Sequence, residues 1–358
     1  MRRTRSPLRL LAIAVAGLTA AAILAAGASG NGVGNETYVV HNLVSDSAAI
    51  PADRHDPNLV NAWGITAGPA TPWWVADNGT DKSTLYNGAG VPVSLVVGVD
   101  GGPTGTVFNG TSDFVVSANG KRATARFLFA SEDGGIRGWN PGVSPNAVVG
   151  TMTPDAVYKG LAIGSSGGSN FLYATNFHAG RVDVFDGSFG LVHMPGAFVD
   201  PQLPAGFAPF GIQNIGGTLF VTYGKQDADA HDEVDAQSLG FVDRFATDGT
   251  FLGRVATRGQ LDAPWGLAMA PQGFGRFSGD LLVGNFGNGR INAYEQQANG
   301  QFEHRGELRD AGHKPITIDG LWGIGFGNGA ASGPTTTLYF AAGPNDEADG
   351  LFGSIEAR

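Results

Sequence analysis

The stretch Asn61-Ala62-Trp63-Gly64-Ile65 recurs, with variations, along the chain. In each copy a large residue is followed by glycine and an aliphatic residue, and two short apolar runs separated by polar turn residues come next. Further copies are Lys159-Gly160-Leu161, Phe210-Gly211-Ile212, Trp265-Gly266-Leu267 and Trp322-Gly323-Ile324. A repeat of roughly 40–50 residues built from short strands is typical of a β-propeller, in which similar sheets stand radially around an axis.

The Trp63 position serves as a marker for counting the repeats. Its equivalents fall at Phe114, Lys159, Phe210, Trp265 and Trp322. Apolar residues alternate with polar ones in several of the runs, as half-buried antiparallel strands require. The sequence therefore predicts an all-β fold, a six-bladed β-propeller of four-stranded antiparallel blades.

Segment 38–44 (Tyr-Val-Val-His-Asn-Leu-Val) precedes the first blade and has the composition of a strand. We expect it to join the last blade and close the ring, because closure removes exposed sheet edges. The glycine after each marker is expected to let the crowded inner strands approach closely. The aromatic residues at 63, 265 and 322 are expected to pack between neighbouring blades.

The first residues resemble an export signal. Four arginines within positions 2–9 precede an uncharged stretch, 10–26, and Ala26-Gly27-Ala28 fits a cleavage site. We predict a signal peptide over 1–28, a flexible linker over 29–36 and a single propeller domain over 37–358. The expected location is secreted or periplasmic, with no stable membrane span after cleavage; a retained N-terminal anchor is the alternative.

The composition limits the classes of partner. The chain of 358 residues has a formal charge of −10, which becomes −14 once the four arginines of 1–28 are removed. Such a surface argues against nucleic acid and anionic membranes as partners and is compatible with divalent cations. No cysteine is present, so the core and topology must hold an exported chain without disulfides. We expect a monomer.

Polar residues collect in two sets of loops, those leading into the first strand of each blade and those joining its second and third strands. In an antiparallel meander both sets lie on the same face. We predict that this axial face binds a ligand through Asn61, Asp77, Asn176, His178, Asn285 and Asn345. Asp and Asn also favour turns for local backbone reasons, which is the alternative explanation for each of them.

Two loops carry more acidic residues than turns need. Asp232-Glu233-Val234-Asp235 and Asp346-Glu347-Ala348-Asp349 fall at corresponding places in the fourth and sixth blades. Such charge density costs repulsion unless a cation or a basic partner offsets it. The predicted metal ligands are Asp232, Glu233, Asp235, Asp346, Glu347 and Asp349, with Ca²⁺ as the expected ion. No EF-hand spacing is present, and a solvated acidic loop is the alternative.

Three stretches carry a resemblance to a known family: Asp56–Gly64, Trp74–Gly79 and Gly343–Gly353. With these the chain resembles an uncharacterised family of secreted bacterial β-propeller proteins. More distantly, the blades are similar to NHL-repeat and gluconolactonase/regucalcin-type propellers, whose enzymes use an axial metal held by Glu, Asn and Asp. Here Asn61 stands where that resemblance implies a Glu, and a Ser-Pro-Asp signature is absent.

The resulting hypothesis is an exported propeller that binds a small or polymeric ligand, with a divalent cation, at the polar axial face. The partner would be a small molecule, a glycan or an extracellular protein. The alternatives are a metal-dependent hydrolase of the lactonase or esterase type at the same face, or a structural platform for protein interactions. No G-x-S-x-G, H-E-x-x-H or phosphate-loop motif is present to identify a reaction.

Overall fold

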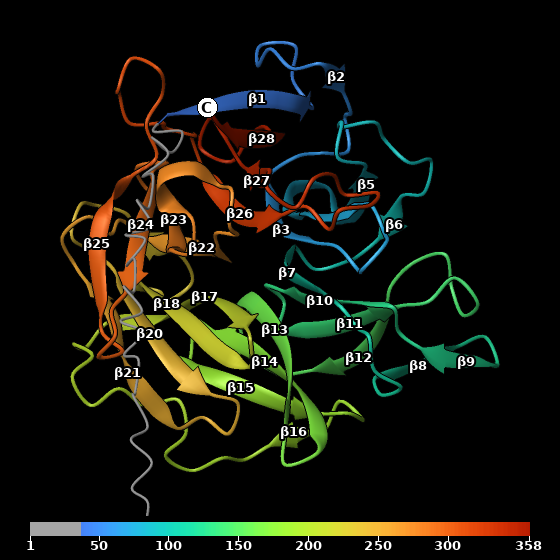
Figure 1. Ribbon diagram of the computed structural model, residues 1–358. Coiled ribbons are helices and arrows are strands. Elements are labelled where there is room, and N and C mark those ends of the chain that lie inside the picture. The colour runs from blue at the N-terminus through green and yellow to red at the C-terminus, as the bar shows by residue number, and fades with distance from the viewer. Residues whose placement is uncertain (1–36) are drawn as a thin grey trace, which may run out of the picture. The chain divides into compact units, whose positions relative to one another are not determined.

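The computed structural model describes residues 37–358, which form six antiparallel sheets around one axis (Figure 1). The predicted signal peptide (1–28) and linker (29–36) lie outside the described residues. Within the described part, no helix has the length and apolar character needed to span a bilayer. The predicted all-β, six-bladed propeller is confirmed.

Each blade runs from an innermost to an outermost strand. Blades 1 to 3 contain β3 (Ala62–Thr66), β4 (Trp73–Asp77), β5 (Lys82–Tyr86) and β6 (Val97–Gly98); β7 (Pro103–Phe108), β10 (Phe127–Ser131), β11 (Gly135–Trp139) and β12 (Val148–Met152); and β13 (Tyr158–Ser166), β14 (Ser169–Asn176), β15 (Arg181–Asp186) and β16 (Leu191–Val192). A separate hairpin, β8 (Val115–Ala118) and β9 (Lys121–Thr124), extends from blade 2.

Blades 4 to 6 complete the ring. They contain β17 (Phe207–Ile215), β18 (Thr218–Gln226), β20 (Phe241–Ala246) and β21 (Phe251–Thr257); β22 (Pro264–Met269), β23 (Leu281–Asn285), β24 (Ile291–Gln296) and β25 (Phe302–Glu307); and β26 (Leu321–Phe326), β27 (Leu338–Ala342) and β28 (Leu351–Ala357). A short strand, β19 (Glu233–Val234), adds to β18 of blade 4. Two 3₁₀ turns span Asn78–Thr80 and Gly275–Phe277.

The ring is closed by β1 (Tyr38–Ser45), which pairs with β28 along its length and becomes the fourth strand of blade 6. The short β2 (Arg54–His55) then pairs in parallel with β1. The phenol of Tyr38, which is 1% exposed, donates to the Phe274 carbonyl at 3.1 Å and so links blade 6 to blade 5. The predicted closure by segment 38–44 is confirmed.

The innermost strands approach one another so closely that only glycine fits after each marker. A Cβ on Gly211 would lie 2.1 Å from the Trp265 carbonyl oxygen, in the next blade. A Cβ on Gly323 would lie 2.6 Å from the Trp63 oxygen, which joins the last blade to the first. These glycines are therefore required by packing of backbone on backbone, as the sequence predicted.

The marker assigned to blade 2 is wrong. The innermost strand of that blade is β7, so the equivalent of Trp63 is Thr104, followed by Gly105. Phe114 instead begins the insertion that forms the β8–β9 hairpin, where it is fully buried with its ring 5.5 Å from that of Phe189. Thr104 was missed because it lacks the aromatic ring that makes the other copies visible.

Candidate functional site

The marker side chains converge on the propeller axis. The rings of Trp63 and Trp322 stack with centroids 3.4 Å apart, and Trp265 meets Trp322 edge-on at 5.9 Å. Phe210, from blade 4, reaches Trp322 at 5.7 Å. A register shift in every innermost strand falls beside the marker; such bulges re-aim side chains. The aromatic residues thus pack across the axis and not merely between neighbouring blades.

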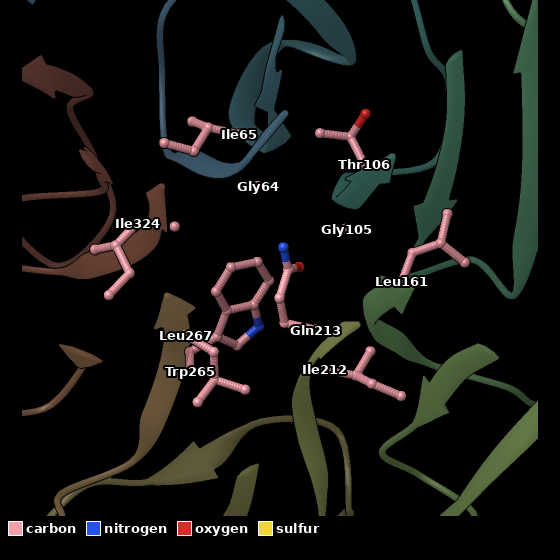
Figure 2. Close-up of a pocket in the computed structure, with 11 residues that line it drawn as sticks. Gly64, Ile65, Gly105, Thr106, Leu161, Ile212, Gln213, Trp265, Leu267 and Ile324 are labelled. Atoms are coloured by element: carbon pink, nitrogen blue, oxygen red, sulfur yellow. The ribbon is translucent and has the colours of Figure 1, made fainter. Parts of the chain in front are cut away.

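Beside this aromatic cluster the channel is narrow. The axial cavity has a volume of about 30 Å³, and it is lined by residues from all six innermost strands (Figure 2). Gln213 and Trp265 project toward its middle (Figure 2). A space of this size holds about one water molecule, so the channel itself has no room for a substrate.

Lys159 occupies the marker position of blade 3 and is 1% exposed. Its ammonium lies 5.1 Å from the centroid of the Trp63 ring and donates to Glu132 Oε1 at 2.5 Å and Asp232 Oδ1 at 2.8 Å. Glu132 follows the second strand of blade 2, and Asp232 lies in the insertion after the second strand of blade 4. The Lys159 ammonium therefore connects blades 2, 3 and 4 at the axis.

A chain of amide hydrogen bonds extends this network to blades 1 and 6. Asn61 Nδ2 donates to Glu347 Oε2 at 3.1 Å and to Asn78 Oδ1 at 3.2 Å, and Asn78 Nδ2 donates to Glu132 Oε2 at 2.8 Å. Asn61 Oδ1 accepts the indole N–H of Trp63 at 3.0 Å. We call Asn61, Asn78, Glu132, Lys159, His231, Asp232, Glu233 and Glu347 the axial cluster.

The charges of the axial cluster shift one another's pKa values. Burial raises the pKa of Glu233 to about 8 and that of Glu347 to about 7, with neighbouring carboxylates adding to the effect and Lys159 opposing it. Burial also disfavours the Lys159 ammonium, but Glu132, Glu233 and Asp232 more than offset this and raise its pKa. The pKa of Asp232 is lowered, since Lys159 outweighs the effect of burial.

Three residues of the axial cluster could hold a metal ion. Ligand atoms of Glu132, His231 and Asp232 all lie within 4.8 Å of one another. His231 Nδ1 is 3.0 Å from Asp232 Oδ1, and Asp232 Oδ2 makes no hydrogen bond within residues 37–358. A nitrogen with two carboxylates is a donor set that suits Mn²⁺ or Zn²⁺ better than Ca²⁺, which prefers oxygen ligands.

The residues predicted to bind a ligand have different surroundings. Asn61 lies in the axial cluster. Asp77 is fully buried and accepts hydrogen bonds from the Thr84 backbone and hydroxyl. Asn176 donates to Asp183 of its own blade at 2.8 Å, and Asn285 donates at 2.8 Å to the Gln260 carbonyl in the loop that enters its blade, so both amides are used in local structure.

The remaining predicted residues lie at the surface. His178 is exposed, and Asn345 Nδ2 donates to Asp349 within its own turn at 2.5 Å. Of the six residues predicted to bind metal, Asp232, Glu233 and Glu347 meet at the axis. The side chains of Asp235, Asp346 and Asp349 make no hydrogen bond or ion pair to that cluster within residues 37–358, although they occupy the same two loops and the Asp349 carbonyl accepts the Asn61 backbone N–H at 3.1 Å.

Sequence reasoning did not select Glu132, Lys159 or Asn78 as site residues. Lys159 was visible as a lysine at a marker position that is aromatic in four of the other five blades. A charged residue where the repeat demands burial needs a partner, and that signal points directly to the axis.

Comparison with known proteins identifies relatives in a virus. Protein R648 of Acanthamoeba polyphaga mimivirus is 31% identical over 339 residues, covering 89% of this chain and 80% of its own length. Protein L690 of the same virus is 32% identical over 343 residues, covering 89% and 86%. The chain belongs to the family of these mimivirus proteins. No family model matches it, and the bacterial, exported character expected from the sequence stays a prediction.

Solved structures with a similar fold are β-propellers. A streptogramin B lyase superposes with a TM-score of 0.51 at 14% identity, covering 90% of this chain and 97% of the lyase. The PQQ-bound aldose sugar dehydrogenase of Streptomyces coelicolor gives a TM-score of 0.52 at 13% identity, covering 90% and 99%. At these identities the likeness shows the fold alone, and it is compatible with either ligand binding or catalysis.

Proposed function

We propose that this protein binds a ligand, together with a divalent cation, at the axial cluster. The observation that supports it is the convergence of acidic side chains from blades 2, 4 and 6 on one face around Lys159. Carboxylates gathered at this density favour cation binding, because the ion offsets their mutual repulsion. In this proposal Glu132, His231 and Asp232 supply the metal ligands, and Asn61 and Glu347 face the bound molecule.

The biological setting belongs to the same proposal. We take the protein to be exported, secreted or periplasmic, and monomeric. Its partner is a small molecule, a glycan or another protein outside the cell, and neither nucleic acid nor a membrane is expected, because the chain is strongly acidic. Glycan arrays with and without cation test the first two classes of partner.

Thermal melting tests the cation. Melting temperatures are measured with EDTA and with Ca²⁺, Mn²⁺ or Zn²⁺, in the native protein and in Asp232→Asn. A cation at about 100 times its dissociation constant stabilises the folded state by about 2.7 kcal/mol, so the native protein should gain several degrees. Mn²⁺ or Zn²⁺ should raise the melting temperature more than Ca²⁺ does, because the His231 nitrogen belongs to the donor set.

The quantity to compare is the shift in melting temperature caused by the cation, since Asp232→Asn also removes the negative charge paired with Lys159. Asp235→Asn is the matched control, because this exposed residue lies in the same loop but has no bond to the axial cluster. The shift should vanish in Asp232→Asn and persist in Asp235→Asn. If none of the three cations changes the melting temperature of the native protein, the proposal is contradicted.

A hydrolase at the same face is the second candidate, favoured by the Glu347 carboxyl, whose pKa is raised to about 7. A carboxyl that titrates near neutrality can both give and take a proton, as general acid–base catalysis requires. A panel of lactones and esters, assayed with the native protein and Glu347→Gln, tests this. Turnover that is lost in Glu347→Gln supports the enzyme, and a protein with neither turnover nor cation response supports an interaction platform.

A further inference from the structure

Three cationic side chains lie beside two aromatic rings on the face of blade 4 that packs against blade 3. Phe207 on β17 and Phe241 on β20 meet edge-on, with ring centroids 4.8 Å apart (Figure 1 shows the strands). Lys225 Nζ is 5.6 Å from the Phe207 centroid, and the Arg254 guanidinium is 4.6 Å from the Phe241 centroid. Arg258 lies near both rings, at 5.7 Å and 5.4 Å. We call these five residues the blade 4 cation patch.

Arg254 is already neutralised by buried carboxylates. It forms ion pairs with Asp200 and Asp243, whose side chains are 1% and 0% exposed. Asp200 belongs to the segment that leads into blade 4, so these ion pairs hold that segment against β20 and β21. Arg254 therefore has a structural role and no unpaired charge for a ligand.

Lys225 and Arg258, in contrast, have no acidic partner. Neither side chain forms an ion pair or donates a hydrogen bond within residues 37–358, although the sequence contains 32 Asp and Glu residues. Lys225 is half-buried and Arg258 is exposed, so solvent reaches both. Two cations beside the same ring repel each other, and an anion bound to both offsets that repulsion.

The backbone and the rings restrict the positions of these two cations. Gly206 has a φ of +80°, and a Cβ on this residue would lie 2.2 Å from Lys225 Nζ, so the ammonium occupies space that a side chain would fill. Arg258 lies beside two rings, and a guanidinium on an aromatic ring keeps the N–H groups at its edge available. Donors that are positioned before binding lose less conformational entropy when a ligand binds.

We propose that Lys225 and Arg258 bind the phosphate group of a small anionic ligand. The guanidinium donates parallel hydrogen bonds to two phosphate oxygens, and the ammonium supplies a second positive charge. Two full charges match a phosphate dianion, whereas a single carboxylate leaves one of them without a partner. This site needs no metal ion, is distinct from the axial cluster and does not depend on the function proposed there.

The probe is inorganic phosphate, titrated at neutral pH into the full protein by isothermal calorimetry. The protein is first freed of metal ions by chelation and dialysis, so that no cation at the axial cluster contributes, and sodium chloride keeps the ionic strength constant. Saturable binding to one site is expected. Arg258→Gln and Lys225→Met should each weaken it at least about fivefold, because each removes a charge-assisted contact, and the double variant should not bind.

Glucose 6-phosphate, with glucose as the matched uncharged compound, distinguishes the two sources of the phosphate group. Tighter binding of the ester than of inorganic phosphate supports an organic phosphate as the ligand, and weaker binding supports free phosphate. In either case the affinity of the ester should fall in Arg258→Gln, and glucose should not distinguish this variant from the native protein.

Arg276→Gln is the matched control, because this exposed arginine also lies over a phenylalanine ring, Phe277, at 5.3 Å, but in blade 5. It should bind phosphate as the native protein does. Melting temperatures of all variants show whether they are folded. The proposal is overturned if the native protein does not bind phosphate saturably, or if folded Arg258→Gln and Lys225→Met bind it unchanged.

Discussion

Lys159 places a full charge where the repeat otherwise places an aromatic ring or a threonine. The residue is 1% exposed and contacts two carboxylates, so its burial is offset by Glu132 and Asp232. Its pKa is raised by those neighbours, so the stabilisation is present at neutral pH and is lost only as the pH rises through the alkaline range. The lysine side chain thus packs against Trp63 at the axis and holds Glu132 and Asp232 of the axial cluster together.

Replacing this lysine tests its role. Lys159→Met leaves Glu132 and Asp232 without their cation and should lower the free energy of unfolding by about 2–4 kcal/mol at pH 7. The value lies below that of a fully buried pair because the Asp232 side chain is 61% exposed. Urea unfolding measures the change. Lys121→Met, on the exposed β9, should stay within about 0.5 kcal/mol of the native protein, and equal losses in both variants would contradict the role.

Asp77 makes the stability depend on pH. Burial raises the pKa of its carboxyl well above the usual value, with the Thr84 hydrogen bonds opposing this. The folded protein therefore keeps a proton that the unfolded chain loses above about pH 4, and the free energy of unfolding falls as the pH rises from there. Asp77→Asn does not titrate, so its unfolding free energy between pH 4.5 and 7.5 should decline less than that of the native protein.

Urea unfolding at several pH values between these limits provides the measurement. Asp235→Asn serves as the comparison, since it removes an exposed carboxyl elsewhere in the fold and leaves the buried one in place. If Asp77→Asn and the native protein lose stability in parallel, the buried carboxyl is not the source of the pH dependence.

Among the elements, β1 is the strand that closes the ring, because it joins the last blade from the other end of the described chain. It forms the fourth strand of blade 6, and without it β28 would become an unpaired edge. Deleting residues 38–46 should therefore lower the melting temperature sharply. His41→Ala, on the same strand but with an exposed side chain, should change it by little. An unaltered melting temperature in the deletion variant would refute the role of β1 in closure.

The repeated marker was enough to locate most of the innermost strands from the sequence. Four Trp-Gly or Phe-Gly copies and Lys159-Gly160 located five of the six innermost strands, because a bulky residue beside an obligatory glycine is rare by chance. The innermost strand of blade 2 was not located, since Thr104 and Gly105 allow the same close packing without an aromatic ring. The pairing of β1 with β28 was predictable, because a spare strand and an incomplete blade complete each other.

The candidate site could be predicted only in part. The loop positions placed Asn61, Asp232 and Glu347 on one face, since strand direction alone decides this. The local sequence cannot tell which side chain reaches the axis and which bonds within its own turn, as Asn345 does. That choice depends on insertion lengths and on contacts between blades distant in sequence, such as Glu132 with Lys159.

For the molecule as a whole, closure brings the two ends of the described chain together. Thr37 N–H donates to the Arg358 carbonyl at 3.2 Å and Arg358 N–H donates to the Thr37 carbonyl at 2.7 Å. A circular permutant that joins these residues by a short linker, and opens the exposed β13–β14 turn between Gly167 and Gly168, should keep the fold.

The permutant should melt within a few degrees of the native protein and give the same circular dichroism spectrum. A second permutant, opened inside β14 at Leu172 and Tyr173, interrupts a buried strand and should be far less stable. If both permutants melt alike, the ring does not behave as one cooperative unit.

The seam between β1 and β28 also sets the order of events during synthesis. The strand that leaves the ribosome ahead of every blade finds its partner only after the last blade has been made, since the contacts at the seam join residues 321 positions apart. Until then the nascent chain carries an unsatisfied strand that can pair with other chains. Chaperone demand should therefore be greatest just before β28 is made.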